Sequence, residues 1–335
     1  MQTLTEIRAI LESAGLAPQK AFGQNFLIDL NLLAKLVELA GLTGSQTVLE
    51  VGPGTGSLSE ELLERCGKLV CVEIDRGLGN VLADRFAWAN NFRLIRGDVL
   101  AGKHELSREV IEAIAPEAHL VSNLPYNIAT PLLAQCLIES WRTLRHDAAL
   151  QSVALDVLHK HAGETPAPQS AQTPAPQAAA ETPAPQQTLC RFARMTFTVQ
   201  RELADRLLAG PGGETYGPVS ILVSLLGKSQ AGPIVPASAF WPRPNVASRM
   251  MRIDLDVARS VEVLDIDILT ALLSAAFAQR RKQIGSLLRR KDAAFAPDAL
   301  AAAMAEAAID QAQRPEQIAT DQYRQMANAL KQMGR

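Results

Sequence analysis

Short apolar runs alternate with segments of helical periodicity through the first third of the chain. Apolar runs bounded by polar residues predict buried strands, because a strand that is covered on both faces needs no polar alternation. Apolar side chains three and four positions apart predict helices that bury one face. The strands are predicted at 48–51, 68–74, 91–97 and 119–121, and the helices at 3–14, 31–39, 58–64 and 78–86. This alternation is typical of an α/β fold with a mostly parallel sheet and helices on both faces.

The middle of the chain carries further sheet segments. Residues 194–199 (RMTFTV) alternate as a strand does and run into a helical segment at 201–208. The apolar segment 220–226 fits either a helix or a strand, and 250–255 predict a final strand. These segments extend the predicted sheet beyond its first four strands.

From Asp265 onward the chain is rich in alanine and reads as helical. Helical spacing recurs at 266–278, 282–290, 297–308 and 320–333. A chain of 335 residues is long enough for two domains, each with a core of its own. We therefore expect a sheet domain over residues 1–258 and a small helical domain over 259–335.

One stretch lacks the composition of a folded segment. TPAPQ occurs three times, beginning at Thr165, Thr173 and Thr182, with Ala, Gln and Ser between the repeats. Such a stretch has too few apolar side chains to offset the entropy of folding. We expect a disordered surface insertion at about 160–188. A passive linker is favoured over a docking site, because the prolines are spaced P-x-P and no Arg or Lys flanks the repeats.

Composition narrows the class of protein. Hydrophobic residues make up 47% of the chain and charged residues 20%, and the formal net charge is −2. These values are ordinary for a soluble globular protein and leave any basic surface local. The four cysteines are scattered without C-x-x-C spacing, which favours reduced thiols over disulfides or a metal site. We find no apolar run of membrane-spanning length and no signal at the N-terminus, so we expect a cytoplasmic protein without a metal.

The first apolar strand runs directly into a glycine-rich loop, VLEVGPGTG. Gly52, Gly54 and Gly56 stand at alternate positions between a strand end and a helix start. Glycines let the backbone turn sharply and approach a ligand closely, at the place where open α/β sheets bind nucleotide-like ligands. The spacing G-x-G-x-G differs from the dinucleotide pattern, and a tight turn alone would also explain it. Glu50 precedes the loop, where it could accept from an ammonium group.

Two acids at the ends of the next strands strengthen the nucleotide interpretation. Glu73 lies about 20 residues past the first glycine, where a carboxylate in such folds binds both ribose hydroxyls. Asp98 follows the third strand and could accept from an adenine amino group. The alternative for Asp98 is a helix or turn cap. Gly52, Gly54, Glu73 and Asp98 are therefore candidate cofactor-binding residues.

The fourth strand leads into Asn123-Leu124-Pro125-Tyr126, at the edge where a catalytic loop belongs in a doubly wound sheet. An exocyclic amino group on a base becomes nucleophilic when two acceptors bind its hydrogens, here the Asn123 amide oxygen and the Leu124 carbonyl. Pro125 stiffens the loop, and the Tyr126 ring offers a surface on which a base can stack. A β-turn with a buried tyrosine is the simpler alternative.

Two further loops carry polar and aromatic residues without a period. Residues 19–29 include Asn25, which can donate and accept, and Leu27, which could supply a backbone group and an apolar wall. A capping segment for the next helix is the alternative. In Phe240–Ser248 two prolines hold the backbone extended, and we expect them to keep an aromatic side chain exposed.

In this order, five segments resemble the ribosomal RNA adenine dimethyltransferase family. They are Gly23–Leu27 (GQNFL), Glu50–Gly56 (EVGPGTG), Val72–Asp75 (VEID), Gly97–Val99 (GDV) and Asn123–Ile128 (NLPYNI). The match is dense from residue 16 to 138 and resumes at 196. The resemblance implies a Rossmann-like methyltransferase fold and an N6,N6-dimethyladenosine product.

The resemblance also implies roles for single residues. It implies S-adenosylmethionine (SAM) as cofactor, held by Asn25, Leu27, Gly52, Glu73, Asp98 and Asn123. It further implies that Phe240 closes on the target base opposite the tyrosine. The family commonly has an acid before the serine of this last motif. Here that residue is Ala247, so a role for the acid does not carry over.

A basic cluster lies within the predicted helical domain. It consists of Arg280, Arg281, Lys282, Arg289, Arg290 and Lys291, with Asp292 as the one acid close by. A solvated helix face is the usual explanation of such a run, but on an otherwise neutral protein phosphate contact is favoured. The segment FAQRRK resembles the family's small-subunit branch. The implied partner is the small-subunit (16S) ribosomal RNA of an immature subunit.

These observations predict a monomeric rRNA adenine N6-dimethyltransferase that uses two successive SAM molecules and is linked to small-subunit maturation. Three alternatives stay open. The first is a resistance-type enzyme that acts on large-subunit (23S) RNA, against which NLPYNI, FAQRRK and the helical C-terminus argue. The second is a DNA adenine methyltransferase, which would normally carry a target-recognition domain. The third is a non-catalytic ribosome-assembly factor that keeps the fold.

Overall fold

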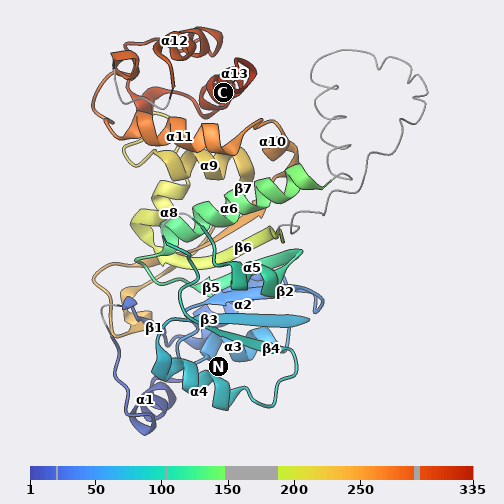
Figure 1. Ribbon diagram of the computed structural model, residues 1–335. Helices are drawn as coiled ribbons and strands as arrows, with labels where there is room; N and C mark the ends of the chain where they lie inside the picture. Colours follow the sequence, from blue (N-terminus) through green and yellow to red (C-terminus); the bar gives the residue numbers. More distant parts are fainter. Residues whose placement is uncertain (20–21, 103–104, 148–187, 290–294, 335) are drawn as a thin grey trace, which may run out of the picture.

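A seven-stranded sheet forms the centre of the computed structural model, which describes residues 1–19, 22–102, 105–147, 188–289 and 295–334 (Figure 1). The strand order is β4-β3-β2-β5-β6-β9-β7. The first five strands in this order are parallel, whereas β9 is antiparallel to both β6 and β7. The strands are β2 Thr47–Val51, β3 Lys68–Glu73, β4 Phe92–Arg96, β5 Glu117–Asn123, β6 Arg191–Gln200, β7 Gly227–Val235 and β9 Ser248–Leu255. The predicted mostly parallel sheet is confirmed.

Helices cover both faces of the sheet, as the buried side chains show. Val48 of β2 packs in one cluster with Leu33 and Leu62, whereas its neighbour Leu49 packs in another with Val110 and Leu132. Successive strand residues point to opposite faces, so the apolar run of β2 fills two cores at once. One face is covered by α2 Leu30–Ala40, α3 Ser57–Leu63 and α4 Arg76–Arg85, and the other by α5 Arg108–Ile114, α6 Ala129–His146 and α9 Pro218–Leu226.

Side-chain caps start several of these helices. Asp29 accepts from the Leu32 N–H at the start of α2, and Asp75 accepts from two N–H groups at the start of α4. Thr3 and Glu6 form a capping box at the start of α1, Leu4–Ser13. Each cap satisfies N–H groups that the first helical turn leaves unpaired.

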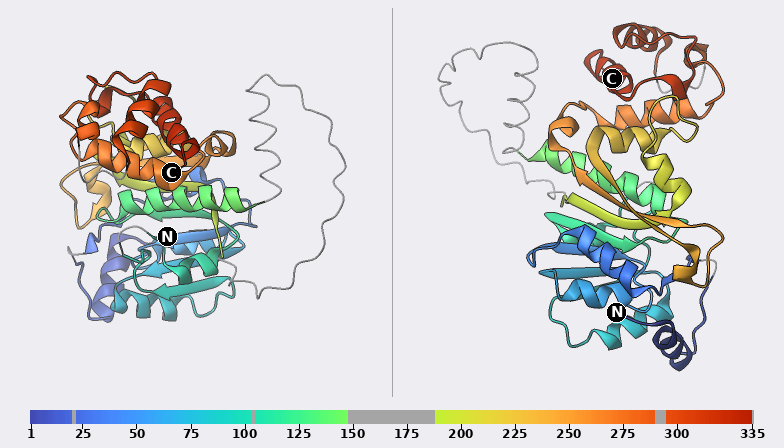
Figure 2. Two further views of the ribbon diagram at one scale, coloured as in Figure 1. Left: turned by 45° about the horizontal axis from the view of Figure 1, so that its top comes forward. Right: turned by 180° about the vertical axis from the view of Figure 1, so that it is seen from behind.

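The C-terminal helices gather at one end of the molecule, and α1 lies at the other (Figures 1 and 2). They are α10 Val257–Val261, α11 Ile266–Phe277, α12 Pro297–Glu306 and α13 Thr320–Gln332. The core of the sheet continues through α9 into these helices, because Leu222, Leu269 and Tyr323 belong to the same buried cluster as Leu49. The division at residue 258 stays a prediction, since one apolar core spans both parts.

The structure differs from the sequence prediction at two places. The helix predicted at 282–290 is wrong: residues Ile284–Arg289 form a 3₁₀ helix. The N–H groups of Ile284 and Gly285 donate to the carbonyls of Gln313 and Gln311, so partners distant in sequence hold the start of this segment. Strand β7 was not predicted, because its exposed edge carries Lys, Ser, Gln and Gly without apolar alternation. The ambiguous segment 220–226 is helical, as part of α9.

The predicted TPAPQ insertion lies outside the described residues, apart from its last position at 188. Within the described ranges, no helix combines the length and the apolar character that a membrane crossing requires.

Candidate cofactor and base-binding site

A cleft lies at the carboxyl ends of β2, β3, β4 and β5, the edge at which open α/β sheets bind their ligands. The cleft brings together ten of the residues singled out in the sequence. They are Asn25, Leu27, Glu50, Gly52, Gly54, Glu73, Asp98, Asn123, Leu124 and Tyr126. These residues come from four strand ends and from the N-terminal loop, so the fold assembles what the sequence spreads over about 100 positions. Phe26 and Ile74, which were not singled out as ligand residues, line it too.

The glycine loop is pressed against two neighbouring segments. Gly52 and Gly54 have φ angles of 66° and 62°, in the left-handed region that favours glycine. A Cβ atom on Gly52 would lie 2.8 Å from Cγ of Pro125, and one on Gly54 would lie 2.8 Å from Cε1 of Phe26. The absence of side chains therefore lets the Asn123–Tyr126 loop and the N-terminal loop close on the same cleft.

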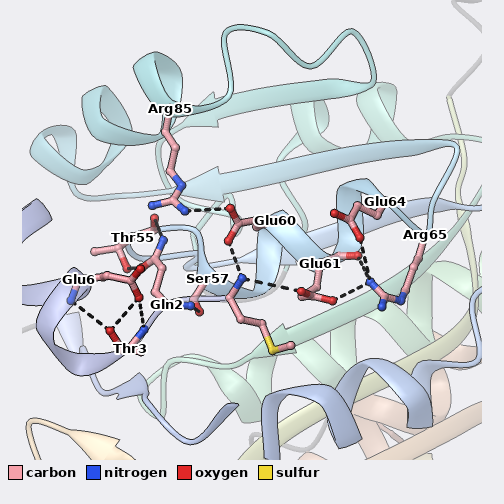
Figure 3. A network of polar contacts seen from close by, with 11 residues as sticks. Gln2, Thr3, Glu6, Thr55, Ser57, Glu60, Glu61, Glu64, Arg65 and Arg85 are labelled. Carbon is pink, nitrogen blue, oxygen red and sulfur yellow. Dashed lines mark hydrogen bonds and ion pairs between the residues drawn. The ribbon is translucent and has the colours of Figure 1, made fainter. Parts of the chain in front are cut away.

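The end of the glycine loop is held from the N-terminal side (Figure 3). The buried Gln2 donates from its side chain to the carbonyl of Thr55 and accepts from the Thr55 hydroxyl. Its backbone N–H donates to Oγ of Ser57, the first residue of α3. These contacts fix the segment that joins the loop to the helix.

Two carboxylates at the floor of the cleft are buried. Glu73 is 4% exposed and accepts from the backbone N–H groups of Asp75 (2.9 Å) and Gly54 (3.3 Å). Burial raises the pKa of Glu73 above its usual value. Glu50 is 2% exposed and accepts from the Ser59 hydroxyl at 2.6 Å. Burial raises the pKa of Glu50 to about 7. Both acids have lone pairs beyond those engaged, so both can accept from a ligand.

Asp98 and the N-terminal loop complete the walls of the cleft. Asp98 is exposed, and its Oδ1 accepts from the Leu100 N–H at 2.9 Å. Asp98 therefore caps a turn through Oδ1, as the alternative predicted. This bond does not engage Oδ2. Leu27 is 5% exposed and supplies an apolar wall from β1, Phe26–Leu27.

The Asn123 carboxamide is held at one end. Its Nδ2 donates to the Asn25 carbonyl at 2.9 Å, and the Asn25 side chain donates to the Gly23 carbonyl. Oδ1 of Asn123 is buried and has no hydrogen-bond partner among the described residues. Buried acceptors are normally paired, so an unpaired one in a cleft is typical of a ligand site.

The two aromatic residues differ in their placement. Tyr126 lines the cleft half-buried, and its hydroxyl makes a 2.8 Å hydrogen bond with Oγ of Ser248. Phe240 is 2% exposed and Trp241 is partly buried, so the predicted exposure of an aromatic side chain in this segment is wrong. Phe240 lies in β8 (Phe240–Trp241), which pairs with β1, and this pairing buries its ring beside Leu27. The sequence carried no local signal for a pairing between segments so far apart.

The basic cluster divides into engaged and exposed members. The guanidinium of Arg280 is half-buried and donates to the carbonyls of Gly213 and Glu214. Arg281 and Lys282 are exposed. The side chains of Arg289 and Arg290 lie outside the described part of the structure. No group of three or more His, Cys, Asp or Glu side chains that could hold a metal ion occurs among the described residues.

The residues present fit SAM. A cradle without side chains at Gly52 and Gly54 admits a ligand close to the backbone, and Glu73 and Asp98 supply acceptors for hydroxyl and amino groups. The unpaired Oδ1 of Asn123 lies at the same cleft and can accept from an amino group beside the cofactor.

Known proteins resemble this chain along most of its length. The family model described as Ribosomal RNA adenine dimethylase matches residues 16–332. A protein of Shouchella clausii named Ribosomal RNA small subunit methyltransferase A is 30% identical over 329 residues, which cover 98% of this chain and 95% of the relative. A protein of the same name from Phenylobacterium zucineum is 33% identical over 290 residues, covering 86% and 82% of the two chains.

Two solved structures share the fold. A dimethyladenosine transferase from Plasmodium falciparum has a TM-score of 0.61 and 19% identity, with coverage of 91% of this chain and 96% of that one. The 23S rRNA methyltransferase ErmE has a TM-score of 0.55 and 19% identity, with coverage of 92% and 100%. The match to the family model extends over nearly the whole chain. The chain belongs to the ribosomal RNA adenine dimethylase family.

Proposed function

We propose that the protein dimethylates N6 of adenines in small-subunit (16S) ribosomal RNA, with two SAM molecules consumed per adenine, during maturation of the small subunit. The observation that carries this proposal is the buried, unpaired Oδ1 of Asn123 at the carboxyl edge of the sheet. An acceptor in this position suits an amino group as the nucleophile. The family membership and the naming of the sequence relatives for the small subunit support the same substrate.

SAM supplies a methyl group activated by its bond to a sulfonium sulfur. In our proposal Glu73 accepts from the ribose hydroxyls and Asp98 from the adenine amino group of the cofactor. Asn25 and Leu27 close the cleft from the N-terminal loop, and the backbone at Gly52 and Gly54 lets the ligand approach. The positions of these residues around one cleft support the assignment.

The target amino group would be held by two acceptors, Oδ1 of Asn123 and the Leu124 carbonyl. When these two acceptors take hydrogen bonds from both N–H groups, the nitrogen lone pair would leave its conjugation with the ring and point toward the methyl group. The amino nitrogen would release its proton to water once it has bonded to the methyl group, so no residue needs to act as a strong base. Positioning of this kind contributes on the order of 7–11 kcal/mol to catalysis.

The adenine itself would leave its stack to reach the cleft, as bases do in enzymes that modify them. Tyr126 offers the ring on which it stacks. Phe240 was predicted to close on the opposite side. Its buried position means that this contact requires a change at β8, and the contact stays a prediction. We assign RNA phosphate contact to the exposed Arg281 and Lys282, with Arg289 and Arg290 as further predicted contacts.

We also propose that the enzyme works as a monomer in the cytoplasm and without a metal. Displacement at a sulfonium methyl group needs no Lewis acid, because the leaving group departs as a neutral thioether. Light scattering coupled to size exclusion should give the mass of one chain. The affinity of the protein for SAM should be the same before and after treatment with a chelator.

Substrate choice tests the main proposal. Recombinant protein and methyl-labelled SAM are offered undermethylated small subunits, large subunits and duplex DNA in parallel, and label is expected only in small-subunit RNA as N6,N6-dimethyladenosine. Label in large-subunit RNA would assign the protein to the resistance type, and label in DNA would exclude the RNA assignment. SAM binding without label in any substrate would favour the non-catalytic assembly factor.

A further inference from the structure

The Tyr126 side chain is tied to a strand that lies far away in the sequence. Its hydroxyl and Oγ of Ser248 are 2.8 Å apart, although 122 positions separate the two residues. Ser248 is 0% exposed and is the first residue of β9. Its backbone pairs with Gln200 on one side and Val235 on the other, so this hydroxyl sits on a rigid part of the sheet.

The other end of the same loop is held by the N-terminal segment. Nδ2 of Asn123 donates to the Asn25 carbonyl directly before β1, and β1 pairs with β8. From β8 the chain runs through residues 242–247 to Ser248. We call the set Asn25–Leu27, Phe240–Trp241 and Ser248 the loop clamp. It holds the Asn123–Tyr126 loop by hydrogen bonds to the first and the last residue of the loop.

The orientation of the Tyr126 ring depends on its hydrogen bond to Ser248 and not on the backbone of the loop. Pro125 restricts the backbone, and the contact between Gly52 and Pro125 limits its movement, but neither fixes the Tyr126 ring. A half-buried tyrosine keeps freedom about two side-chain torsions, and a hydrogen bond from its hydroxyl to a rigid partner selects one ring orientation. The ring that is to receive the base is therefore aimed from β9.

We infer that Ser248 is a positioning residue for methyl transfer, which fixes the plane of the Tyr126 ring so that the extruded adenine stacks with its amino group at Asn123. The inference rests on the proposed function for the nature of the base. The hydroxyl pair acts on the alignment of the bound base, so its loss lowers kcat more than it weakens SAM binding.

A double-mutant cycle on the full chain tests this inference. Tyr126→Phe and Ser248→Ala each remove one hydroxyl of the pair, and the double variant removes both. The control is Ser260→Ala, because Ser260 is also 0% exposed but donates to the Leu226 carbonyl, outside the cleft. For each protein kcat and KM are measured with undermethylated small subunits, SAM affinity is measured by calorimetry, and Tm is measured by thermal unfolding.

Each single variant should lower kcat roughly fivefold to tenfold, the effect of one lost hydrogen bond, and the double variant should be no slower than the singles. SAM affinity should stay within about twofold, and Ser260→Ala should keep the wild-type kcat whatever its Tm. Wild-type kcat in the single variants, or losses that multiply in the double variant, would overturn the inference. So would a fall in SAM affinity as large as the fall in kcat.

Failure of the proposed function is recognised separately, because the wild-type protein then leaves small-subunit RNA unlabelled. The cycle is in that case repeated with whichever nucleic acid is labelled, and the same outcomes decide whether Ser248 positions Tyr126.

Discussion

The Asn123 side chain is fixed at its amide nitrogen and unengaged at its oxygen. The bond from Nδ2 to the Asn25 carbonyl sets the plane of the amide, and Oδ1 is left buried without a partner in the described structure. An unpaired buried acceptor costs about 1–3 kcal/mol in the free protein. A ligand N–H that meets this oxygen recovers part of that free energy, so the residue is prepared for a donor before the substrate arrives.

Replacement of Asn123 by alanine separates two possible roles of this residue. If Asn123 orients the target amino group, Asn123→Ala should lower kcat about 100-fold, the usual effect of removing one preorganised hydrogen-bonding group. SAM affinity should change little, since Glu73, Asp98 and the glycine loop remain. Single-turnover methylation and calorimetric SAM binding measure the two effects. Equal losses in both would identify Asn123 mainly as a cofactor ligand.

Glu50 gives the stability of the protein a pH dependence whose sign can be worked out. Burial raises its pKa from 4.5 to about 7, so the folded protein keeps this proton over a pH range in which the unfolded chain has released it. The free energy of unfolding therefore falls as the pH rises from about 4.5 to 7, by about 3 kcal/mol in all. Below pH 4.5 this penalty is absent, and above pH 7 it is complete.

Glu50→Gln removes this titration and keeps an acceptor for the Ser59 hydroxyl. The variant should gain free energy of unfolding relative to the wild type at pH 8 and little at pH 5. Urea unfolding at several pH values in this range measures both proteins. If the free energy of unfolding depends on pH in the same way for both proteins, the raised pKa of Glu50 is contradicted.

At the scale of elements, buried apolar strands were predictable and the exposed edge was not. The runs that became β2 and β3 are apolar because helices cover both faces of them. Strand β7 lies at the edge and faces solvent along most of its length, so hydrophobic burial imposes no pattern on it. The wrong helix at 282–290 has a different cause, because bonds to Gln311 and Gln313 override local propensity there.

The residues of the site were predictable where they stand at the ends of successive strands. They were less predictable where their positions depend on pairing between segments distant in sequence. Glu73, Asp98 and Asn123 each lie at the end of a predicted strand or just past it, so parallel strands bring them to one edge of the sheet. The burial of Phe240 and the bond between Tyr126 and Ser248 depend on β8 and β9. No local sequence pattern predicts a two-residue strand that pairs with the N-terminal loop.

Strand β6 contains a hydroxyl whose removal should stabilise the protein. Oγ1 of Thr196 is buried and unpaired within the described structure, between Val121 and Arg252 on the neighbouring strands. Thr196→Val keeps the shape and removes the unsatisfied group, which should raise the free energy of unfolding by about 1 kcal/mol. The contrasting variant is Ser122→Ala, which breaks a 2.7 Å bond to the Val51 carbonyl and should lower it by a similar amount. Chemical unfolding measures both, and a loss of stability in Thr196→Val would show that the hydroxyl has a partner.

At the scale of the whole molecule, one apolar core joins the methyltransferase sheet to the C-terminal helices. Tyr216, on the segment that precedes α9, is 0% exposed, and its hydroxyl bonds to the Ile318 carbonyl and to Thr320 at the start of α13. Arg280, in the turn that follows α11, makes a second connection through hydrogen bonds to the carbonyls of Gly213 and Glu214. The C-terminal helices are thereby fixed relative to the sheet, so cations on them can dock RNA at a set position relative to the cleft.

In our proposal this arrangement separates RNA docking from chemistry, and variants of the exposed cations test that separation. The double variant Arg281→Gln, Lys282→Gln should bind small-subunit RNA more weakly. The slope of log affinity against log salt should fall by about 1.5, because each lost phosphate contact removes about 0.7–0.9. Saturating RNA should restore kcat, and SAM affinity should be unchanged.

The matched control for this pair is Arg65→Gln, Arg108→Gln, which removes the same charge from exposed positions on the sheet part of the molecule. Filter binding from 50 to 300 mM salt, a range of about sixfold that resolves such slopes, compares the two variants with the wild type. If both pairs change the slope equally, the overall charge steers the RNA. If only the Arg281 and Lys282 pair changes it, the contact belongs to the end of the molecule that the shared core holds in place. A rigid link of this kind lets distant phosphate contacts contribute to the placement of a single adenine at Asn123.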